Sequence, residues 1–387
     1  MREEKTLKKK KLLYILNIAN KVNNFSYTSM IAAQELGIEF HIAGNWSYKT
    51  DEERLADEQK YGIKIHQIDF VRTPYHPGNL KAYNQLKQIL KEENYDFIHC
   101  NTPVGGVLGR LVGKKYNIKK IIYQAHGFHF YKGAPKINWL IYYPVEKLLA
   151  RYTDALITIN KEDYEFAKSK LKLRNNGKVY YVPGVGIDVL QNKIDLSLRE
   201  VKREELCIPM DAFVLISVGE LNTNKNNKVI VSAMAKNNDD NVHYVVCGIG
   251  PAEKDLREQV DATGLQNNVH FVGYRNDIKE MYQMADCFVM SSFREGLSRS
   301  IMEAMASGLP CIVSKIRGNV DLIEKDKNGF LCETTNASEY AEKITILANN
   351  AELCKKMSSN NLLKIKKFSK KTIIRETYQI YNKEFIN

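Results

Sequence analysis

The sequence FREGLSRSIMEAMASGLP, residues 293–310, decides the fold of this chain. It follows an apolar run at 287–290 that is typical of a buried strand. Glu295 lies in the Gly-containing turn after this run, and Glu303 lies about two helical turns further on, in a segment that ends near Gly308. Open α/β folds bind ligands with this order of strand, carboxylate-bearing turn and helix, because the helix N-terminus points backbone N–H groups at anions.

Apolar runs alternate with helix-like segments along the rest of the chain, which indicates parallel α/β architecture. The polar segment 188–209 breaks the alternation, and we expect a linker there. The interpretation is two Rossmann-like domains, residues 1–190 and 191–370, with a ligand cleft between them. The expected strands are 11–16, 40–44, 97–100, 120–125, 155–159 and 179–183 in the first domain, and 213–219, 242–248, 269–273, 287–290 and 310–313 in the second.

The composition of the 387-residue chain, 44% hydrophobic and 26% charged, is that of an ordinary soluble protein. We find no apolar run near eighteen residues, the length typical of a membrane-spanning helix. The lysine-rich segment 1–11 leads into a short strand rather than a signal-peptide core, so we expect a cytoplasmic protein. The seven cysteines are scattered singly, which argues against a disulfide framework or a cysteine zinc site.

The positive charge of the chain is concentrated in its first half. Residues 1–190 carry 30 Lys and Arg against 19 Asp and Glu, whereas the remainder carries 27 against 26. A basic half can be a solvated surface or can contact an anionic partner. No nucleic-acid-binding module pattern is present, so we expect no nucleic-acid partner and keep peripheral contact with an anionic membrane as the alternative to a solvated surface.

The two glutamates and the Ala-Met-Ala-Ser-Gly-Leu-Pro that ends the quoted stretch resemble the family-4 retaining glycosyltransferases with the GT-B fold. Within that family the chain looks most like bacterial enzymes of capsular and exopolysaccharide synthesis. The resemblance implies an acceptor-binding first domain, a donor-binding second domain and a C-terminal helix, 371–387, that packs back on the first domain. Further phrases that carry the resemblance are 98–106, 125–133, 159–163, 219–222, 271–278 and 316–319.

In the second domain, the resemblance implies that Glu303 accepts hydrogen bonds from both ribose hydroxyls of a nucleotide sugar. Glu295 would lie against the donor sugar ring as a catalytic residue. Lys225, six residues after Gly219, would neutralise the diphosphate. The remaining donor-binding candidates act mainly through backbone groups: Gly296, Leu297 and Ser298 toward the diphosphate, and Tyr274 and Arg275 toward the base.

The phosphate-binding part of this pattern has one departure. The family often carries an arginine directly after the glycine, where this chain has Glu220, so Arg299 and Arg317 are the candidates to replace it. The chain contains no Asp-x-Asp, which favours a metal-independent reaction without a cofactor.

In the first domain, the resemblance implies that His126 hydrogen-bonds the donor sugar near the reaction centre as the second catalytic candidate. His129 and Lys132 on the same loop are candidates to meet acceptor phosphates. The aromatic segment 138–149 reads either as core or as a contact for membrane or polyprenyl lipid.

The sequence is therefore interpreted as a hexosyltransferase-type glycosyltransferase that moves a sugar, most simply from a uridine diphosphate sugar, to a lipid-linked saccharide at the inner face of the plasma membrane. The expected path is front-face substitution with retention, in which the departing phosphate oxygen takes the acceptor proton. Two alternatives stay open, namely a nucleotide-sugar epimerase on the same fold and a non-enzymatic binding module that uses the basic half.

Overall fold

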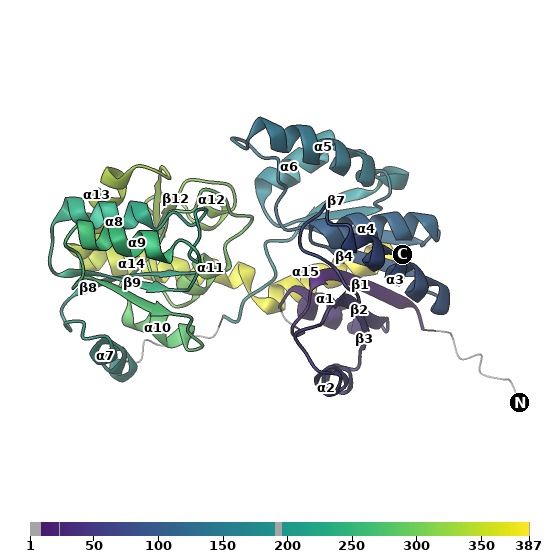
Figure 1. The fold of residues 1–387 in the computed structure, drawn as a ribbon, viewed down its shortest axis with the longest axis horizontal. Helices are drawn as coiled ribbons and strands as arrows, with labels where there is room; N and C mark the ends of the chain where they lie inside the picture. The colour runs from purple at the N-terminus through teal and green to yellow at the C-terminus, as the bar shows by residue number, and fades with distance from the viewer. Residues whose placement is uncertain (1–8, 23, 190–195, 387) are drawn as a thin grey trace, which may run out of the picture. The chain divides into compact units, whose positions relative to one another are not determined.

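The computed structural model describes residues 9–22, 24–189 and 196–386, and the chain forms two compact units (Figure 1). Unit 1 comprises Met1–Gly186 together with Lys370–Asn387, and unit 2 comprises Ile187–Ser369. Most of the lysine-rich N-terminal segment and the expected boundary at 190/191 lie outside the described residues. Each unit is a parallel sheet with helices on both faces, so the predicted pair of Rossmann-like domains is confirmed.

Unit 1 has a seven-stranded parallel sheet in the order β3-β2-β1-β4-β5-β6-β7. Its central strand β1 is buried on both faces from Leu12 to Asn17, because apolar residues there are continuous rather than alternating. In register, Leu13 lies opposite His41 of β2 and Ile98 of β4. The strands are β1 Lys11–Ile18, β2 Glu39–Asn45, β3 Lys64–Gln67, β4 Phe97–Asn101, β5 Lys120–Ala125, β6 Ala155–Thr158 and β7 Lys178–Tyr181.

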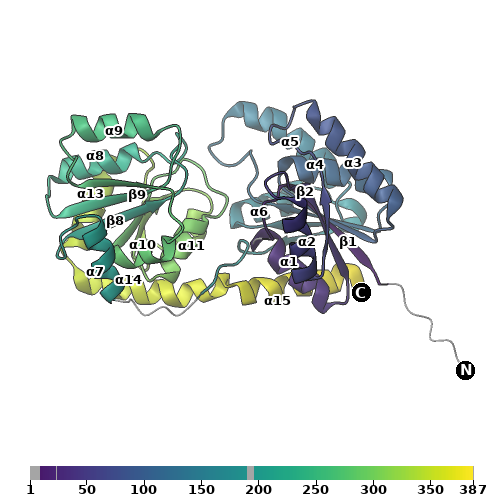
Figure 2. The same ribbon diagram turned by 60° about the horizontal axis from the view of Figure 1, so that its bottom comes forward.

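The helices of unit 1 cover the two faces of this sheet unequally (Figure 2). Core residues of α3 to α6 pack on one face, and those of α1 and the C-terminal helix α15 pack on the other. The Tyr381 hydroxyl of α15 is hydrogen-bonded to His99 Nδ1 of β4 at 2.5 Å, so α15 is part of this core. The helices are α1 Asn24–Glu35, α2 Asp51–Tyr61, α3 Gly78–Glu92, α4 Pro103–Lys115, α5 Lys136–Ala150, α6 Lys161–Lys170 and α15 Lys370–Tyr381.

Unit 2 has a six-stranded parallel sheet in the order β10-β9-β8-β11-β12-β13. One face is covered by α8, α9 and α13 and the other by α10, α11 and α12. The strands are β8 Phe213–Val218, β9 Val242–Cys247, β10 Val269–Gly273, β11 Cys287–Met290, β12 Cys311–Ser314 and β13 Gly329–Cys332. The helices are α7 Leu196–Glu205, α8 Lys228–Asn237, α9 Glu253–Ala262, α10 Ile278–Met284, α11 Arg299–Ala306, α12 Asn319–Leu322, α13 Ala337–Ala348 and α14 Ala351–Lys364.

Unit 2 has the strand order 3-2-1-4-5-6 of the doubly wound fold, and unit 1 has the same order with a seventh strand, β7, added after the sixth. In unit 1, strands β1 to β3 extend the sheet to one side and strands β4 to β7 extend it to the other, so the order reverses between β1 and β4. In unit 2 the order reverses in the same way between β8 and β11. Ligands of such sheets bind beyond the carboxyl ends of the strands at these switch points. The fold therefore directs attention to the loops that follow β1 and β4 in one unit and β8 and β11 in the other.

The segment 188–209 is not simply a linker, and that expectation was wrong in part. It contains α7, which packs against α10. Arg203 of α7 is fully buried, and its guanidinium donates to the carbonyl oxygens of Ala212 and Met284 and to Asp286. A buried arginine bonded in this way looks like an ordinary surface residue in the sequence, which is why the helix was missed.

Candidate active site

The loops after β8 and β11 meet at the switch point of unit 2. They bring Lys225 and Glu295 together, with Lys225 Nζ 2.8 Å from Glu295 Oε1. The two side chains are 23% and 15% exposed, so the pair is largely shielded. Lys225 and Gly219 also line a cavity with the hydroxyl-bearing residues Ser217 and Tyr244. Two residues that lie 70 positions apart in the chain thus share one site.

Hydrogen bonds between the two loops fix this arrangement. Phe293 N donates to Asn224 O at 2.8 Å, and Asn224 Nδ2 donates to Arg294 O at 3.0 Å. On the next turn, Ser291 Oγ donates to Asn226 O at 2.8 Å. These bonds join the residue before Lys225 to the residue before Glu295, so the separation of the cation and the carboxylate is set by backbone.

Gly219 and Gly248 form the floor of the same region by close backbone approach. The φ of Gly248 is 152°, and a Cβ there would lie 1.9 Å from Gly219 O. Gly248 and Gly250 therefore allow the backbone after β9 to pack closely against the backbone after β8. Gly248 N also donates to Gly273 O at 2.8 Å, which joins the loop of Tyr274 and Arg275 to this floor.

The turn 295–298 leads directly into helix α11. Ser298 caps the helix, because its Oγ accepts from Ile301 N at 3.4 Å. On the other side of the turn, the buried Arg317 donates from Nε to Glu295 O at 3.4 Å. A helix N-terminus and two cationic side chains, Lys225 and Arg317, therefore surround this turn, and such a site favours an anion.

The remaining charged candidates of unit 2 already have partners. Glu303 Oε1 accepts from Arg299 Nε at 2.7 Å across one helical turn, and its side chain is 29% exposed. The Glu220 side chain accepts from Asn222 Nδ2 at 3.1 Å and lies on an exposed residue. Arg317 is thus the arginine next to the Glu295 turn, whereas Arg299 is engaged with Glu303.

Tyr274 and Arg275 follow β10, and their side chains differ in setting. The Tyr274 residue is 74% exposed. The guanidinium of Arg275 donates to Asp277 Oδ1 at 2.7 Å and to Glu205 Oε1 at 2.8 Å, and these carboxylates raise the pKa of Arg275. The Arg275 side chain is therefore committed to a structural ion pair, and its backbone is the part left for a ligand.

In unit 1, His126 follows β5 and is held by a residue that the sequence did not single out. His126 Nε2 donates to Asn101 Oδ1 at 3.1 Å, with the amide orientation assigned from this bond. Within the described residues, His126 Nδ1 is buried and has no hydrogen-bond partner. Burial lowers the pKa of His126 to about 4, so the ring is neutral at pH 7 and presents one unused acceptor.

Asn17 and Thr102 lie at the switch point of unit 1, at the end of β1 and after β4. Asn17 Oδ1 accepts from Gly105 N at 2.6 Å and from Thr102 Oγ1 at 2.8 Å. Thr102 has φ 64° and ψ 161°, a region that is populated almost only by glycine and that costs about 1–3 kcal/mol. The extended ψ follows from Pro103, but nothing in the sequence indicates the positive φ.

His129 and Lys132 lie on the loop that continues from His126. The His129 ring packs against Tyr142 of α5 with centroids 4.6 Å apart. Lys132 is exposed, and its backbone N donates to Glu162 Oε1 at 2.8 Å. The structure thus makes His129 a packing residue and leaves the ammonium group of Lys132 at the surface.

Comparisons with known proteins agree with this architecture. Residues 17–160 match the family described as "Glycosyl transferase 4-like", and residues 199–363 match "Glycosyl transferases group 1". The chain is 36% identical to EpsD of Bacillus subtilis (strain 168), over 96% of each protein. It belongs to the family-4 glycosyltransferases.

The chain is also 30% identical to an Escherichia coli enzyme, over 71% of this chain and 72% of that enzyme. That relative is named UDP-Gal:alpha-D-GlcNAc-diphosphoundecaprenol alpha-1,3-galactosyltransferase. Among solved structures, Anabaena HepE in complex with UDP superimposes with a TM-score of 0.77 at 20% identity, covering 96% of this chain and all of HepE. This likeness confirms the GT-B fold. In the described part of the enzyme, no helix is both long and apolar enough to cross a membrane.

Proposed function

We propose that this glycosyltransferase moves a hexose-type sugar from a uridine diphosphate sugar to a hydroxyl of a lipid-linked saccharide, with retention of anomeric configuration. The observation that carries the donor half is the Lys225–Glu295 pair beside the Ser298-capped helix. The E. coli relative is named for a UDP-Gal donor and a diphosphoundecaprenol acceptor, and a Campylobacter jejuni relative, 26% identical, is named for a diphospho-undecaprenol acceptor. HepE contains UDP. These names support the same substrate classes here.

In this proposal the diphosphate lies between Lys225, Arg317 and the backbone N–H groups of 296–298. Developing negative charge on the leaving phosphate is stabilised by fixed cations and helix dipole, so the reaction proceeds without a metal. Gly219 allows the diphosphate to approach the backbone closely. Glu303 accepts the ribose hydroxyls after exchanging its bond to Arg299, and Tyr274 borders the base.

Glu295 and His126 act on the donor sugar. Glu295 accepts from a ring hydroxyl once the diphosphate takes over Lys225, and its charge favours the cation that develops at the anomeric carbon. His126 Nδ1 accepts from another sugar hydroxyl, since its Nε2 proton is held by Asn101. The departing phosphate oxygen takes the acceptor proton, so no separate general base is needed.

The acceptor is proposed to reach the enzyme from a membrane through helix α5, at the inner face of the plasma membrane. The aromatic residues of the segment 138–149 pack inward, as the rings of Trp139 and Tyr143 contact Phe130 and Phe166. The outward face is aliphatic instead, with a spacing of three or four residues. Its exposed members are Ile137, Leu140, Ile141, Val145 and Leu148.

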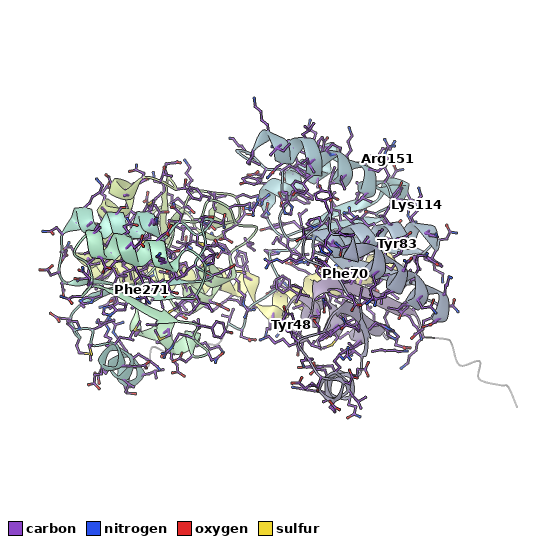
Figure 3. All side chains as sticks on the ribbon, viewed as in Figure 1. Tyr48, Phe70, Tyr83, Lys114, Arg151 and Phe271 are labelled. Atoms are coloured by element: carbon purple, nitrogen blue, oxygen red, sulfur yellow. The ribbon has the colours of Figure 1, made fainter. Side chains whose placement is uncertain are left out.

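Basic residues lie in α5 and next to its ends, and a helix that lies on an anionic membrane combines such residues with an apolar face. Lys136 and Lys147 belong to α5, Arg151 follows it, and Lys114 lies in the last turn of α4 (Figure 3). The face thus combines apolar area for the lipid with charge for its head groups. His129, packed on α5, and Lys132 are the proposed contacts for the acceptor diphosphate.

The test is a thermal-shift panel with the nucleoside diphosphates of uridine, guanosine, thymidine, adenosine and cytidine and with their sugars. A ligand at about a hundred times its Kd stabilises by about 2.7 kcal/mol, which raises the Tm by several degrees. We expect a shift with the uridine series, followed by sugar transfer to a polyprenyl-diphosphate saccharide in a vesicle assay. Conversion of the donor sugar in the absence of acceptor would instead indicate an epimerase. Salt-sensitive vesicle binding without any nucleotide response would indicate a binding module.

A further inference from the structure

A second cluster of titratable side chains lies in unit 1, on strands β2 and β3 and on the connection before β4, and none of its members belongs to the loops that follow β1 and β4. His41 of β2 and His66 of β3 meet there, with His41 Nδ1 3.2 Å from His66 Nε2. Glu93, after helix α3, brings Oε2 to 3.7 Å from His41 Nδ1. One ligand atom of each residue lies within 4.8 Å of the others. We propose that His41, His66 and Glu93 bind a divalent transition-metal ion of the zinc class.

The distances fit the coordination chemistry of zinc. Zinc binds imidazole nitrogen at about 2.0–2.1 Å in tetrahedral geometry, so two such nitrogens lie about 3.3–3.4 Å apart. The observed 3.2 Å between His41 Nδ1 and His66 Nε2 is close to that value. Two imidazoles and one carboxylate are also a ligand set that zinc uses. To place a metal ion between the two nitrogens, the Tyr95 hydroxyl, which contacts both, must move aside, and the Glu93 carboxylate must approach His41.

A second carboxylate orients one of the two histidines. His41 Nε2 donates to Glu39 Oε1 at 2.7 Å, so the lone pair of this neutral ring is on Nδ1 and faces His66. Metal-binding histidines are commonly held by such a carboxylate on the far nitrogen. The His41 side chain is only 1% exposed, so its orientation is also fixed by packing.

Tyr95 and two lysines occupy the cluster when the ion is absent. The Tyr95 hydroxyl lies 2.7 Å from His41 Nδ1 and 3.0 Å from His66 Nε2, so it can donate to His41 and accept from a protonated His66 Nε2. Lys11 Nζ lies 2.8 Å from Glu93 Oε2 and 3.4 Å from Glu39 Oε1, so it keeps a carboxylate partner if the metal takes Glu93. The Lys64 side chain, which also pairs with Glu93, is 54% exposed and can move into solvent.

The second unit provides an internal comparison. His243 of β9 and His270 of β10 occupy the corresponding second and third strands, and their ring nitrogens lie 2.9 Å apart. The charged group that affects the pKa of His243 is a cation, Arg203, rather than a carboxylate. Among the residues that the structure describes, only the His41, His66 and Glu93 group meets the spacing of a metal site. The pair in unit 2 is therefore a matched control.

The role that follows is structural. β3 is a four-residue edge strand that is only partly buried, and Glu93 lies in the connection between α3 and β4. A metal ion bound to His41, His66 and Glu93 would tie this edge strand and this connection to the buried strand β2. We expect the ion to raise stability and to leave binding of the nucleotide unaffected.

The experiment uses the full chain, freed of any affinity tag and of metal by dialysis against a chelator. Zn²⁺ is titrated in competition with a chromophoric chelator, and Co²⁺ is titrated with its visible absorption as a report of tetrahedral nitrogen and oxygen coordination. We expect one equivalent to bind and the Tm to rise by several degrees. His66→Gln and Glu93→Gln should each lower the affinity at least tenfold, while His270→Gln should leave it unchanged.

Both tested side chains are partly exposed, and the circular dichroism of each metal-free variant checks that it folds. The absence of stoichiometric binding at micromolar metal would overturn the proposal, and the cluster would then be a hydrogen-bonded histidine pair alone. Equal loss of affinity in the His270→Gln variant, or none in His66→Gln, would also overturn it. Since nucleotide binding is not the readout, failure of the proposed transferase function would leave this result unaffected.

Discussion

At the scale of single residues, the Lys225–Glu295 pair makes opposite predictions for its two members. Lys225→Ala removes a cation from the proposed diphosphate site, so UDP binding should weaken by at least tenfold. Glu295→Gln removes the carboxylate that holds Lys225, so UDP alone should bind as well as before or more tightly, while sugar transfer falls by two orders of magnitude or more. Calorimetric titration with UDP and a transfer assay separate the two effects. Equal weakening of UDP binding by both changes would remove Lys225 from the phosphate site.

The neutral state of His126 predicts a pH dependence. Because burial lowers its pKa to about 4, below the ordinary value of about 6.5, the folded chain binds fewer protons than the unfolded chain between these values. The contribution of the neutral His126 ring to the free energy of unfolding is fully present above pH 6.5, and it is lost as the pH falls toward 4. Between pH 7 and pH 5, the His126→Asn variant should lose up to about 2 kcal/mol less free energy of unfolding than the wild type, as measured by urea unfolding.

The same variant has a second readout. His126→Asn keeps a polar side chain but removes the Nδ1 acceptor from its present position, so kcat should fall while Kd for UDP stays unchanged. Wild-type turnover in this variant would exclude His126 from the reaction centre. An identical loss of stability in both proteins on acidification would mean that His126 does not contribute to the pH effect and would contradict this prediction.

At the scale of elements, the N-terminus of helix α11 has a structural cap and a proposed functional role. Ser298→Ala removes the cap of α11, which should cost about 1 kcal/mol of stability and also weaken UDP binding severalfold, since the N–H groups of this turn are the proposed contacts of the diphosphate. Asn350→Ala is the matched control, because Asn350 caps α14 in the same way. That control should lose comparable stability and keep its UDP affinity. Weakening of UDP binding in both variants would indicate a general loss of stability instead.

The elements also show how far the sequence could predict the structure. Central strands such as β1 were found because they are buried on both faces and read as continuous apolar runs. The edge strand β3, Lys-Ile-His-Gln, was missed because it has no such run. The strand β13, Gly-Phe-Leu-Cys, was missed although it is apolar, because its run is only three residues long. In the site, Lys225 and Glu295 came from the family resemblance. Asn101 and Thr102 lie in the phrase 98–106 that carries the resemblance but were given no role, and Asn17 was not singled out, because the bonds of these residues depend on loop backbone that forms only in the fold.

At the scale of the whole molecule, the aliphatic face of α5 predicts how the enzyme reaches its acceptor. Leu140→Glu together with Leu148→Glu places charge on two residues that are 72% and 52% exposed, so the fold should tolerate both. Sedimentation with anionic vesicles and transfer to a membrane-held acceptor should fall at least tenfold, while UDP binding is unchanged. Leu363→Glu, on α14 and 67% exposed, is the control and should have no effect. Unaltered vesicle binding in the double variant would rule out this face.

Helix α15 has a consequence for the order in which the protein matures. One face of the unit 1 sheet is partly covered by Ile373, Ile380 and Tyr381, which follow unit 2 in the chain. Until these residues are synthesised, that apolar face is without part of its cover, although its strands precede unit 2. Unit 2, which contains only Ile187–Ser369, is complete earlier. A nascent chain halted before α15 should therefore expose an apolar surface that chaperones recognise, and chaperone release should coincide with synthesis of α15.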